Sequence, residues 1–273
     1  MGFLSLTVIR KKTMASDPLS VKGIILESRE YKEKDRIVTI LTRNHGILDF
    51  VAKGTAKPGS KMSAVSLPYL LCDFVLTDSH GFYYLKEVSI IASNAGIMNS
   101  LEAMAVGAHC ASCLKSSVLQ SDNAANAYEL SVYTFYALSE MPSKAAFIYA
   151  AFNWRLVSDL GLGASYSSCN GCGVDVTGSN GVYLSYNDNQ CYCSNCGEKY
   201  CGNRRADFKL VSSSTVQLLD KIIDSEYSKI FMFTPGENSL EELREFTTEY
   251  LRRQFESDIV DPIKRLDIGL NRL

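Results

Sequence analysis

Histidine, long apolar runs and the common catalytic signatures are scarce or missing in this chain of 273 residues. The three histidines, His45, His80 and His109, adjoin no nucleophile motif. The sequence has no GxSxG elbow, P-loop, dinucleotide-binding glycine fingerprint or HExxH helix. Glu241 and Glu242 are neighbours that diverge on a helix, so they predict a solvated face rather than an acid–base pair. These absences favour a binding protein over an enzyme.

No apolar stretch approaches the length of a membrane span. The first nine residues are mostly apolar, but the basic cluster Arg10–Lys12 follows them, whereas a signal peptide has its charges first. Met14 could serve as an alternative start. We therefore expect residues 1–20 to form a flexible extension and the protein to stay in the cytoplasm.

Four of the nine cysteines form two CxxC pairs. Cys169 and Cys172 make the first pair, and Cys193 and Cys196 make the second after twenty intervening residues. Two such turns supply the four thiolates of a tetrahedral zinc site, and this closed shell leaves no place for water or substrate. We predict one structural Zn²⁺ per chain. Because the cysteines suggest no disulfide framework, a reducing cytoplasm fits best.

The segment between the two pairs has the turn and strand residues of a short hairpin, which is too small to bury a core unaided. The metal is therefore expected to hold it folded. Two further thiols leave the ligand set open, because Cys191 or Cys201 could replace a neighbour. Cys110 and Cys113 form a third CxxC in a run of small and apolar residues, and we predict that both are buried on a helix.

The overall formal charge of −2 hides a basic amino-terminal part. Residues 10–61 hold twelve Lys/Arg against six Asp/Glu, whereas residues 62–273 hold sixteen against twenty-four. Lys53, Lys57 and Lys61 follow at four-residue intervals in a segment with Gly, Pro and no acid. Such a mobile loop suits a nucleic-acid backbone, because lysines bind phosphates as point charges. An ordinary solvated loop is the alternative.

Five segments between residues 21 and 88 have the composition of strands, separated by turn-rich pieces. Their count and spacing predict an antiparallel barrel of the OB-fold type, whose open face commonly binds single strands through basic and aromatic residues. Most of the aromatic side chains are expected to pack in the barrel, and the rest are candidates for base stacking. The strands are Val21–Ser28, Arg36–Arg43, Gly46–Ala52, Leu67–Leu76 and Phe82–Val88; the aromatics are Tyr31, Phe50, Tyr69, Phe82, Tyr83 and Tyr84.

After about Ala92 the apolar residues recur at helical spacing, first from Leu101 and then up to Trp154, before Gly161 can stop the helix. The sequence thus predicts an α+β protein. An N-terminal five-stranded OB-fold barrel precedes an all-α domain that carries a four-cysteine zinc-ribbon insertion. The expected boundaries are 1–20 for the extension, 21–91 for the barrel, 92–165 for the first helical part, 166–203 for the zinc module and 204–273 for the second helical part.

Two further helices are predicted at 215–224 and 240–255. Ser239 and Glu242 have the spacing of a capping box, in which Glu242 reaches back to the first turn of its own helix. The basic residues near the end of this helix complement its dipole, or they extend a nucleic-acid surface. They are Arg244, Arg252 and Arg253, with Lys264 and Arg265 beyond them.

The order of these features resembles the recombination mediator RecO family, and the resemblance covers Leu19 to about Leu266. The barrel part is similar in Tyr31–Thr42, Gly46 and Val51–Gly54. The helix before the zinc module is similar in Arg155–Leu156 and Leu160–Gly161, which lead into the first cysteine pair.

The resemblance implies a non-enzymatic DNA repair protein that binds single- and double-stranded DNA and anneals complementary strands. It implies as partners RecR, with which the family helps to load RecA, and the acidic C-terminal tail of single-stranded DNA-binding protein. It also implies a nucleoid-associated protein of the cytoplasm. The positions that match the family's basic barrel surface are Arg36, Lys53, Lys57 and Lys61. Lys34 and Arg43 are nearby candidates.

Two other functions are compatible with the sequence. A zinc-ribbon adaptor would recruit proteins through the module and the acidic helical part without annealing DNA, and its basic loop would be incidental. A nucleic-acid-modifying enzyme with a zinc ribbon would need an activated nucleophile or a cofactor loop, and the sequence shows neither.

Overall fold

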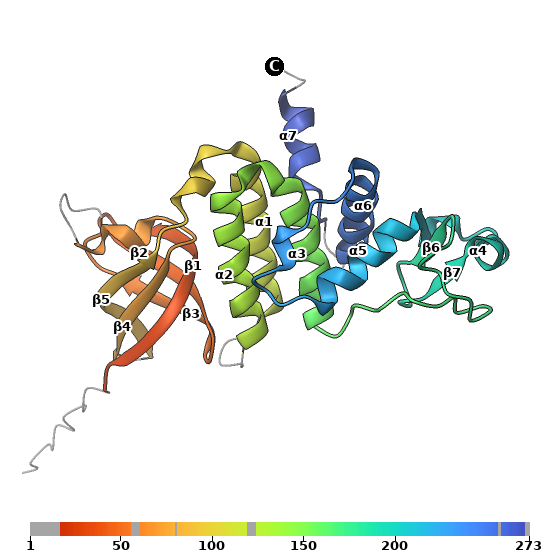
Figure 1. The fold of residues 1–273 in the computed structure, drawn as a ribbon. Coiled ribbons are helices and arrows are strands. Elements are labelled where there is room, and N and C mark those ends of the chain that lie inside the picture. Colours follow the sequence, from red (N-terminus) through yellow and green to blue (C-terminus); the bar gives the residue numbers. More distant parts are fainter. Residues whose placement is uncertain (1–16, 56–60, 80, 119–123, 256–257, 271–273) are drawn as a thin grey trace, which may run out of the picture.

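The computed structural model describes residues 17–55, 61–79, 81–118, 124–255 and 258–270. A barrel lies at one end of the molecule, a helical middle follows, and a small sheet lies at the other end (Figure 1). One apolar core runs through all three parts, from Ile24 of the barrel through Trp154 to Leu184 of the small sheet.

Five strands close into a barrel in the order β1-β2-β3-β5-β4. The strand pairs are antiparallel except for a short parallel contact between β3 and β5, at Phe50 and Tyr83. This order confirms the predicted five-stranded OB-type barrel. Ile25, Ile40 and Phe74 are among the side chains that fill its interior. The strands are β1 (Leu19–Tyr31), β2 (Asp35–Thr42), β3 (Gly46–Ala52), β4 (Leu71–Ser79) and β5 (Phe82–Ala92).

The fourth strand begins later than the sequence pattern predicts. A 3-10 helix, Lys61–Ser66, stands where a loop was expected, and β4 starts at Leu71 instead of Leu67. Between them Pro68 has no N–H to donate to a sheet, and Tyr69 has a φ of 67° that turns the chain. Tyr69 and Leu70 are therefore buried at a turn rather than in a strand, and Leu67 is exposed.

The helical middle packs around α3, whose residues are buried on nearly every side. Trp154 of this helix donates its indole N–H to the carbonyl oxygen of Leu219 at 3.1 Å. No helix among the described residues is both long and apolar enough to cross a membrane. The helices are α1 (Leu101–Ser117), α2 (Ala125–Glu140), α3 (Ala145–Asp159), α5 (Ser213–Asp224), α6 (Glu237–Gln254) and α7 (Pro262–Leu270).

Helix α1 buries a face that includes small residues as well as Val106 and Leu114. Leu101 is 59% exposed and Met104 is 39% exposed, whereas Gly107 and Cys110 are buried. A side chain at Gly107 would begin 3.2 Å from the ring of Tyr69, which itself stacks on Phe135 of α2. The barrel thus approaches α1 closely, and only a face of small residues permits that approach.

The small sheet has three strands in the order β7-β6-β8. The hairpin of β6 (Val182–Ser185) and β7 (Cys191–Cys193) was expected between the cysteine pairs, and α4 (Ser194–Cys201) follows it. The sequence analysis missed β8 (Phe208–Val211), which pairs with β6 although it lies beyond residue 203. Four residues between two turns give too short a pattern to indicate a strand.

The predicted capping box is wrong. Helix α6 begins at Glu237 after Gly236, and no side chain caps its first turn. The Glu242 carboxylate instead accepts hydrogen bonds from Ser212 N–H at 2.8 Å and Thr215 Oγ1 at 2.6 Å, so it caps the start of α5. Ser239 is buried and bonds to Ser214. Glu242 therefore does not lie on a solvated face, because a helix distant in sequence offers it unpaired donors.

Candidate metal centre and cationic surfaces

The two CxxC pairs come together in space, as their spacing predicts. The sulfur atoms of Cys169, Cys172, Cys193 and Cys196 all lie within 4.8 Å of one another. Cys172 and Cys193 are 3.8 Å apart, which is the separation of about 3.8 Å that metal–sulfur bonds of about 2.3 Å require in a tetrahedron. The cluster therefore has the size and donor set of a tetrahedral tetrathiolate site.

Backbone N–H groups stabilise the ionised form of a thiol in this cluster, which is the form that binds a cation. Burial opposes ionisation of Cys169, but N–H groups of Cys193, Gly171 and Cys172 direct hydrogen bonds at its sulfur and lower the pKa of the thiol to about 6. The N–S distances from Cys193 and Gly171 are 3.2 and 3.4 Å. A hydrogen bond with Cys172 raises the pKa of Cys196 to about 12. A metal ion would displace the proton that these thiols share.

The two alternative ligands lie outside the cluster. Cys191 is buried with its sulfur 3.1 Å from the carbonyl oxygen of Ser168, and burial raises its pKa to about 11. Cys201 is also buried, and burial raises its pKa. Cys110 and Cys113 of α1 are buried as predicted, and burial raises the pKa of Cys113 to about 12. Protonated buried thiols of this kind are poor ligands and poor nucleophiles.

Three of the predicted cationic residues meet where the β1–β2 turn lies beside the end of β3. Lys34 and Lys53 are exposed, and Arg36 is half-buried. The Asp35 carboxylate accepts a hydrogen bond from Gly54 N–H at 2.9 Å, which ties the β1–β2 turn to the end of β3. The Arg36 guanidinium donates to Ser28 Oγ at 2.8 Å, so it braces the hairpin and is less available to a ligand.

Arg43 lies at the opposite end of the barrel, next to α2. Its side chain is 57% exposed and pairs with Glu129 at 3.0 Å. It borders a cavity of about 330 Å³ together with Lys22, His45 and Tyr128. The structure thus separates Arg43 from Lys34 and Lys53. Lys57 lies outside the described residues, and for Lys61 the structure gives the backbone alone, at the start of the 3-10 helix.

Two of the aromatic residues that the sequence analysis named as stacking candidates lie beside lysines here, and one of these lysines, Lys32, was not named in it. Lys53 lies 4.6 Å from the ring centre of Tyr84, and Lys32 lies 5.1 Å from that of Tyr31. Phe82 is 66% exposed, but it lies at the β4–β5 hairpin, opposite Ser79, and not at the β1–β2 turn. The basic run of residues 29–36 contained the signal for Lys32, but its pairing with an aromatic ring depends on the turn. We call Tyr31, Lys32, Lys34, Lys53 and Tyr84 the barrel-end cluster.

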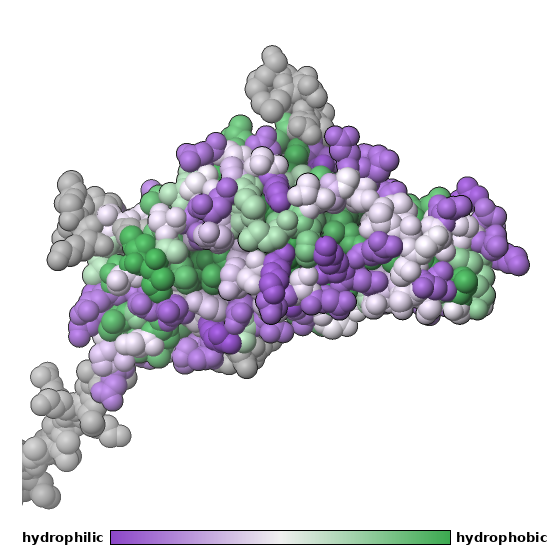
Figure 2. All heavy atoms as spheres, in the orientation of Figure 1, coloured by the Kyte–Doolittle hydropathy of each residue, from purple (hydrophilic) through white to green (hydrophobic). Residues whose placement is uncertain are grey.

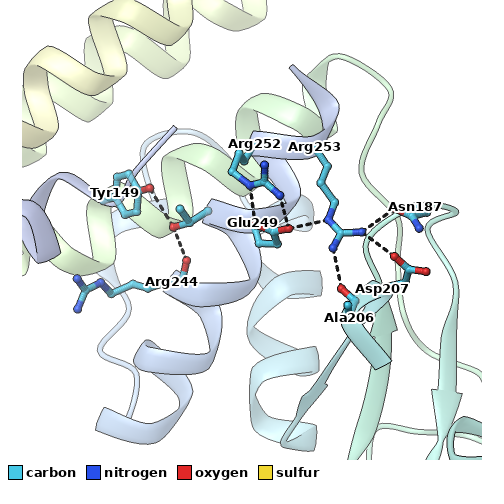
Figure 3. A network of polar contacts seen from close by, with 9 residues as sticks. Tyr149, Asn187, Ala206, Asp207, Arg244, Glu249, Arg252 and Arg253 are labelled. Atoms are coloured by element: carbon cyan, nitrogen blue, oxygen red, sulfur yellow. Dashed lines mark hydrogen bonds and ion pairs between the residues drawn. The ribbon is translucent and has the colours of Figure 1, made fainter. Parts of the chain in front are cut away.

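The arginines of α6 do not form a free cationic surface. Arg253 donates to Glu249, Asp207 and the carbonyl oxygen of Ala206, and Arg252 pairs with Glu249 (Figure 3). Arg244 pairs with buried Asp261 at 2.7 Å. These pairs fix the small sheet and the C-terminal segment to α6 and leave the barrel-end cluster as the stronger candidate for an anion.

A Cys–His–Asn arrangement occurs on α1 and α3, but it lacks an activated nucleophile. His109 Nε2 is 2.7 Å from Asn153 Oδ1 and 3.5 Å from the sulfur of Cys113. Burial lowers the pKa of His109 and raises that of Cys113, so both groups stay neutral near pH 7. A neutral thiol is a weak nucleophile.

Comparison with known proteins agrees with this geometry. The family description "Recombination protein O N terminal" matches residues 14–94, and "Recombination protein O C terminal" matches residues 98–260. The DNA repair protein RecO of Acetivibrio thermocellus is 30% identical over 251 residues, covering 91% of this chain and 97% of the relative. The protein of that name from Bacillus subtilis is 30% identical over 181 residues, covering 65% of this chain and 68% of the relative. The chain therefore belongs to the RecO family of DNA repair proteins.

Proposed function

We propose that this protein is a recombination mediator that binds single- and double-stranded DNA at the barrel-end cluster and anneals complementary strands. The observation that carries the proposal is the exposure of Lys34 and Lys53, which the β1–β2 turn and the end of β3 bring together, with Lys53 beside the ring of Tyr84. Membership of the RecO family supports it. The mechanism needs no bond chemistry, because annealing requires charge neutralisation and strand alignment.

Each step of the mechanism uses groups of the barrel-end cluster. Lysine ammonium groups bind phosphates and release the counterions condensed on the strand. The rings of exposed Tyr31 and half-buried Tyr84 can stack on bases without selecting a sequence. A strand held by its backbone keeps its pairing edges free, so a complementary strand can approach with less repulsion.

The tetrathiolate cluster would hold one Zn²⁺ through Cys169, Cys172, Cys193 and Cys196. The support is the donor set, the tetrahedral spacing and the amides that point at sulfur. When bound, the ion supplies folding free energy and no Lewis-acid chemistry. Its role is to keep the hairpin and α4 folded at the far end of the molecule.

The partners of this function follow the family. RecR would act with the protein to load RecA, and the acidic C-terminal tail of single-stranded DNA-binding protein would recruit it to covered strands. Such a protein works at the nucleoid in the cytoplasm. The same family membership supports a mediator without enzymatic activity of its own.

Charge reversal of the barrel-end cluster tests the proposal. The double variant Lys34→Glu and Lys53→Glu should lose at least about tenfold in affinity for an oligonucleotide and in annealing rate, since each reversal turns a phosphate contact into a repulsion. The matched control is Lys221→Glu with Lys229→Glu, two exposed lysines of the helical part. If Lys34→Glu with Lys53→Glu anneals strands at the wild-type rate and still binds protein partners, a protein-interaction adaptor is favoured instead.

A further inference from the structure

A second cationic surface lies on the zinc module, at the end of the molecule opposite the barrel. The segment Lys199–Arg205 holds three basic residues and no acid. Lys199, Arg204 and Arg205 are exposed, and none of them forms an ion pair with any residue that the structure describes. Arg253 and Lys209, which lie nearby, are both paired with carboxylates. The three cations therefore remain available to an anionic ligand.

An aromatic stack stands within this surface. Tyr200 is 48% exposed, and its ring stacks on that of Tyr192 with centres 4.8 Å apart. Tyr192 is buried, bonds through its hydroxyl to Gln190, and packs edge-on against Phe208. The Arg204 guanidinium donates to the carbonyl oxygen of Tyr200 at 3.3 Å. The exposed ring is thus backed by a fixed stack and flanked by a cation.

Gly171 leaves room for the ring of Tyr200 because it has no side chain. A side chain there would begin 3.0 Å from both Tyr200 and the sulfur of Cys196. Tyr200 therefore lies against the first CxxC turn, and its position depends on the metal cluster. This contact connects the aromatic surface to the folding of the zinc module.

Three acidic groups of the zinc module lie near these cations, among them exposed Asp188, whose charge acts on Tyr192. Glu198 precedes Lys199 but lies roughly 160° around α4 from Tyr200. Asp207 is held by Arg253 (Figure 3). Four thiolates around a divalent ion carry a formal −2, which the N–H groups directed at sulfur partly offset. The face formed by Tyr200, Arg204 and Arg205 stays cationic, and hydrophilic side chains cover the tip of the molecule over α4 (Figure 2).

We propose that Lys199, Tyr200, Arg204 and Arg205 form a second binding surface for single-stranded nucleic acid. Unpaired cations beside an exposed ring are the combination that holds a strand by its phosphates and stacks one base, without reading sequence. The inference rests on the proposed DNA-binding function. It adds that one chain contacts nucleic acid at both of its ends, which lie on either side of the helical middle (Figure 1).

Photo-crosslinking tests this surface directly. Oligo(dT) of about 60 nucleotides, longer than the 4 to 16 that one OB-fold covers, is irradiated with the full-length protein, and the crosslinked peptides are identified by mass spectrometry. We expect a crosslink at Tyr200 that persists in Lys34→Glu with Lys53→Glu and falls at least about fivefold in Arg204→Gln with Arg205→Gln. The control Lys221→Gln with Lys229→Gln should crosslink as the wild type does, and each variant should retain wild-type metal content.

The outcomes separate this inference from the proposed function. Crosslinks in the barrel with none at Tyr200 would overturn the second surface and leave DNA binding intact. An unchanged yield of the Tyr200 crosslink in Arg204→Gln with Arg205→Gln would also overturn it, because the two cations would then not contribute to binding. If neither end crosslinks, the proposed function fails as well. Loss of a protein partner by the arginine variant, with unchanged crosslinking, would assign the surface to protein recognition and contradict the inference.

Discussion

Arg155 shows how a single side chain joins two helices that are distant in sequence. Its guanidinium is 12% exposed, pairs with Asp159 at 2.9 Å, and donates to the carbonyl oxygens of Ile222 at 3.1 Å and Ser225 at 2.7 Å. It also lies 4.2 Å from the ring centre of Tyr227. The side chain therefore satisfies carbonyl groups at the end of α5 that no helical N–H can reach.

Removing this side chain should destabilise the helical part. We expect Arg155→Ala to lower the free energy of unfolding by about 3 kcal/mol, because it leaves the half-buried Asp159 carboxylate without its cationic partner and the end of α5 without a donor. Urea denaturation measures the change. Arg252→Ala is the matched control, since it removes an exposed ion pair with Glu249 and should have little effect. Equal stability of the two variants would contradict this role of Arg155.

Glu249 gives the fold a defined response to acid. Hydrogen bonds from Arg252, and then from Arg253, lower the pKa of this carboxyl to about 2 despite partial burial. A depressed folded-state pKa contributes stability above the ordinary value of about 4.5, and this contribution is lost as the pH falls toward 2. Glu249→Gln should therefore be less stable than the wild type at pH 6, and most of this difference should be lost at pH 2.5.

Denaturation curves of both proteins at each pH test this expectation. Metal loss in acid affects the two proteins alike, so it cancels in the difference between them. A difference in stability that stays constant from pH 6 to pH 2.5 would show that the carboxylate charge contributes nothing.

Residue-level prediction succeeded where the chemistry is local in sequence. The four cysteines could be paired because each CxxC turn fixes two ligands within four residues. The partner of Glu242 could not be foreseen, because Ser212 lies 30 residues away and meets it only when α5 packs on α6. Arg43 looked equivalent to Lys34 in the charge pattern, but the length of β2 separates them.

At the scale of elements, the zinc module is a unit whose parts depend on one another. The hairpin supplies Cys193, α4 supplies Cys196, and the preceding turn supplies the first pair. Cys172→Ser should therefore lose the metal and lower the melting temperature. Cys201→Ser alters a buried thiol outside the cluster and should retain one ion per chain. Metal content and melting temperature, measured on the same samples, test these two expectations. Metal loss by both variants would refute the assigned ligand set.

Periodicity predicted the helices but not which face of each is buried. Leu101 and Met104 keep helical spacing, yet α1 turns Gly107 toward the barrel, because close contact with Tyr69 outweighs the burial of two larger side chains. Strand β8 escaped detection for a related reason: it is defined by its pairing with β6, which a four-residue pattern cannot report. Local signals give the type of an element, and its neighbours decide its orientation and edges.

At the scale of the whole molecule, helices α1 and α2 pack against β1 and β2 of the barrel, and the 3-10 helix Lys61–Ser66 packs Val65 into the barrel core. Lys115 pairs with Glu27 at 2.8 Å, and Ala124 N–H donates to the carbonyl oxygen of Arg43, so α1 and the start of α2 hold this side of the barrel. Lys34 and Lys53 lie beyond these contacts. The net charge of −2 conceals this arrangement, because the excess of Lys/Arg in residues 10–61 is offset by the excess of Asp/Glu in residues 62–273.

The salt dependence of oligonucleotide affinity tests the central claim most directly. For single strands, each phosphate contact contributes about 0.7 to the slope of log affinity against log salt. Replacing two lysines in Lys34→Gln with Lys53→Gln should make that slope shallower by about 1.4 relative to the wild type. An unchanged slope and affinity in the variant would show that the barrel-end cluster does not bind the strand.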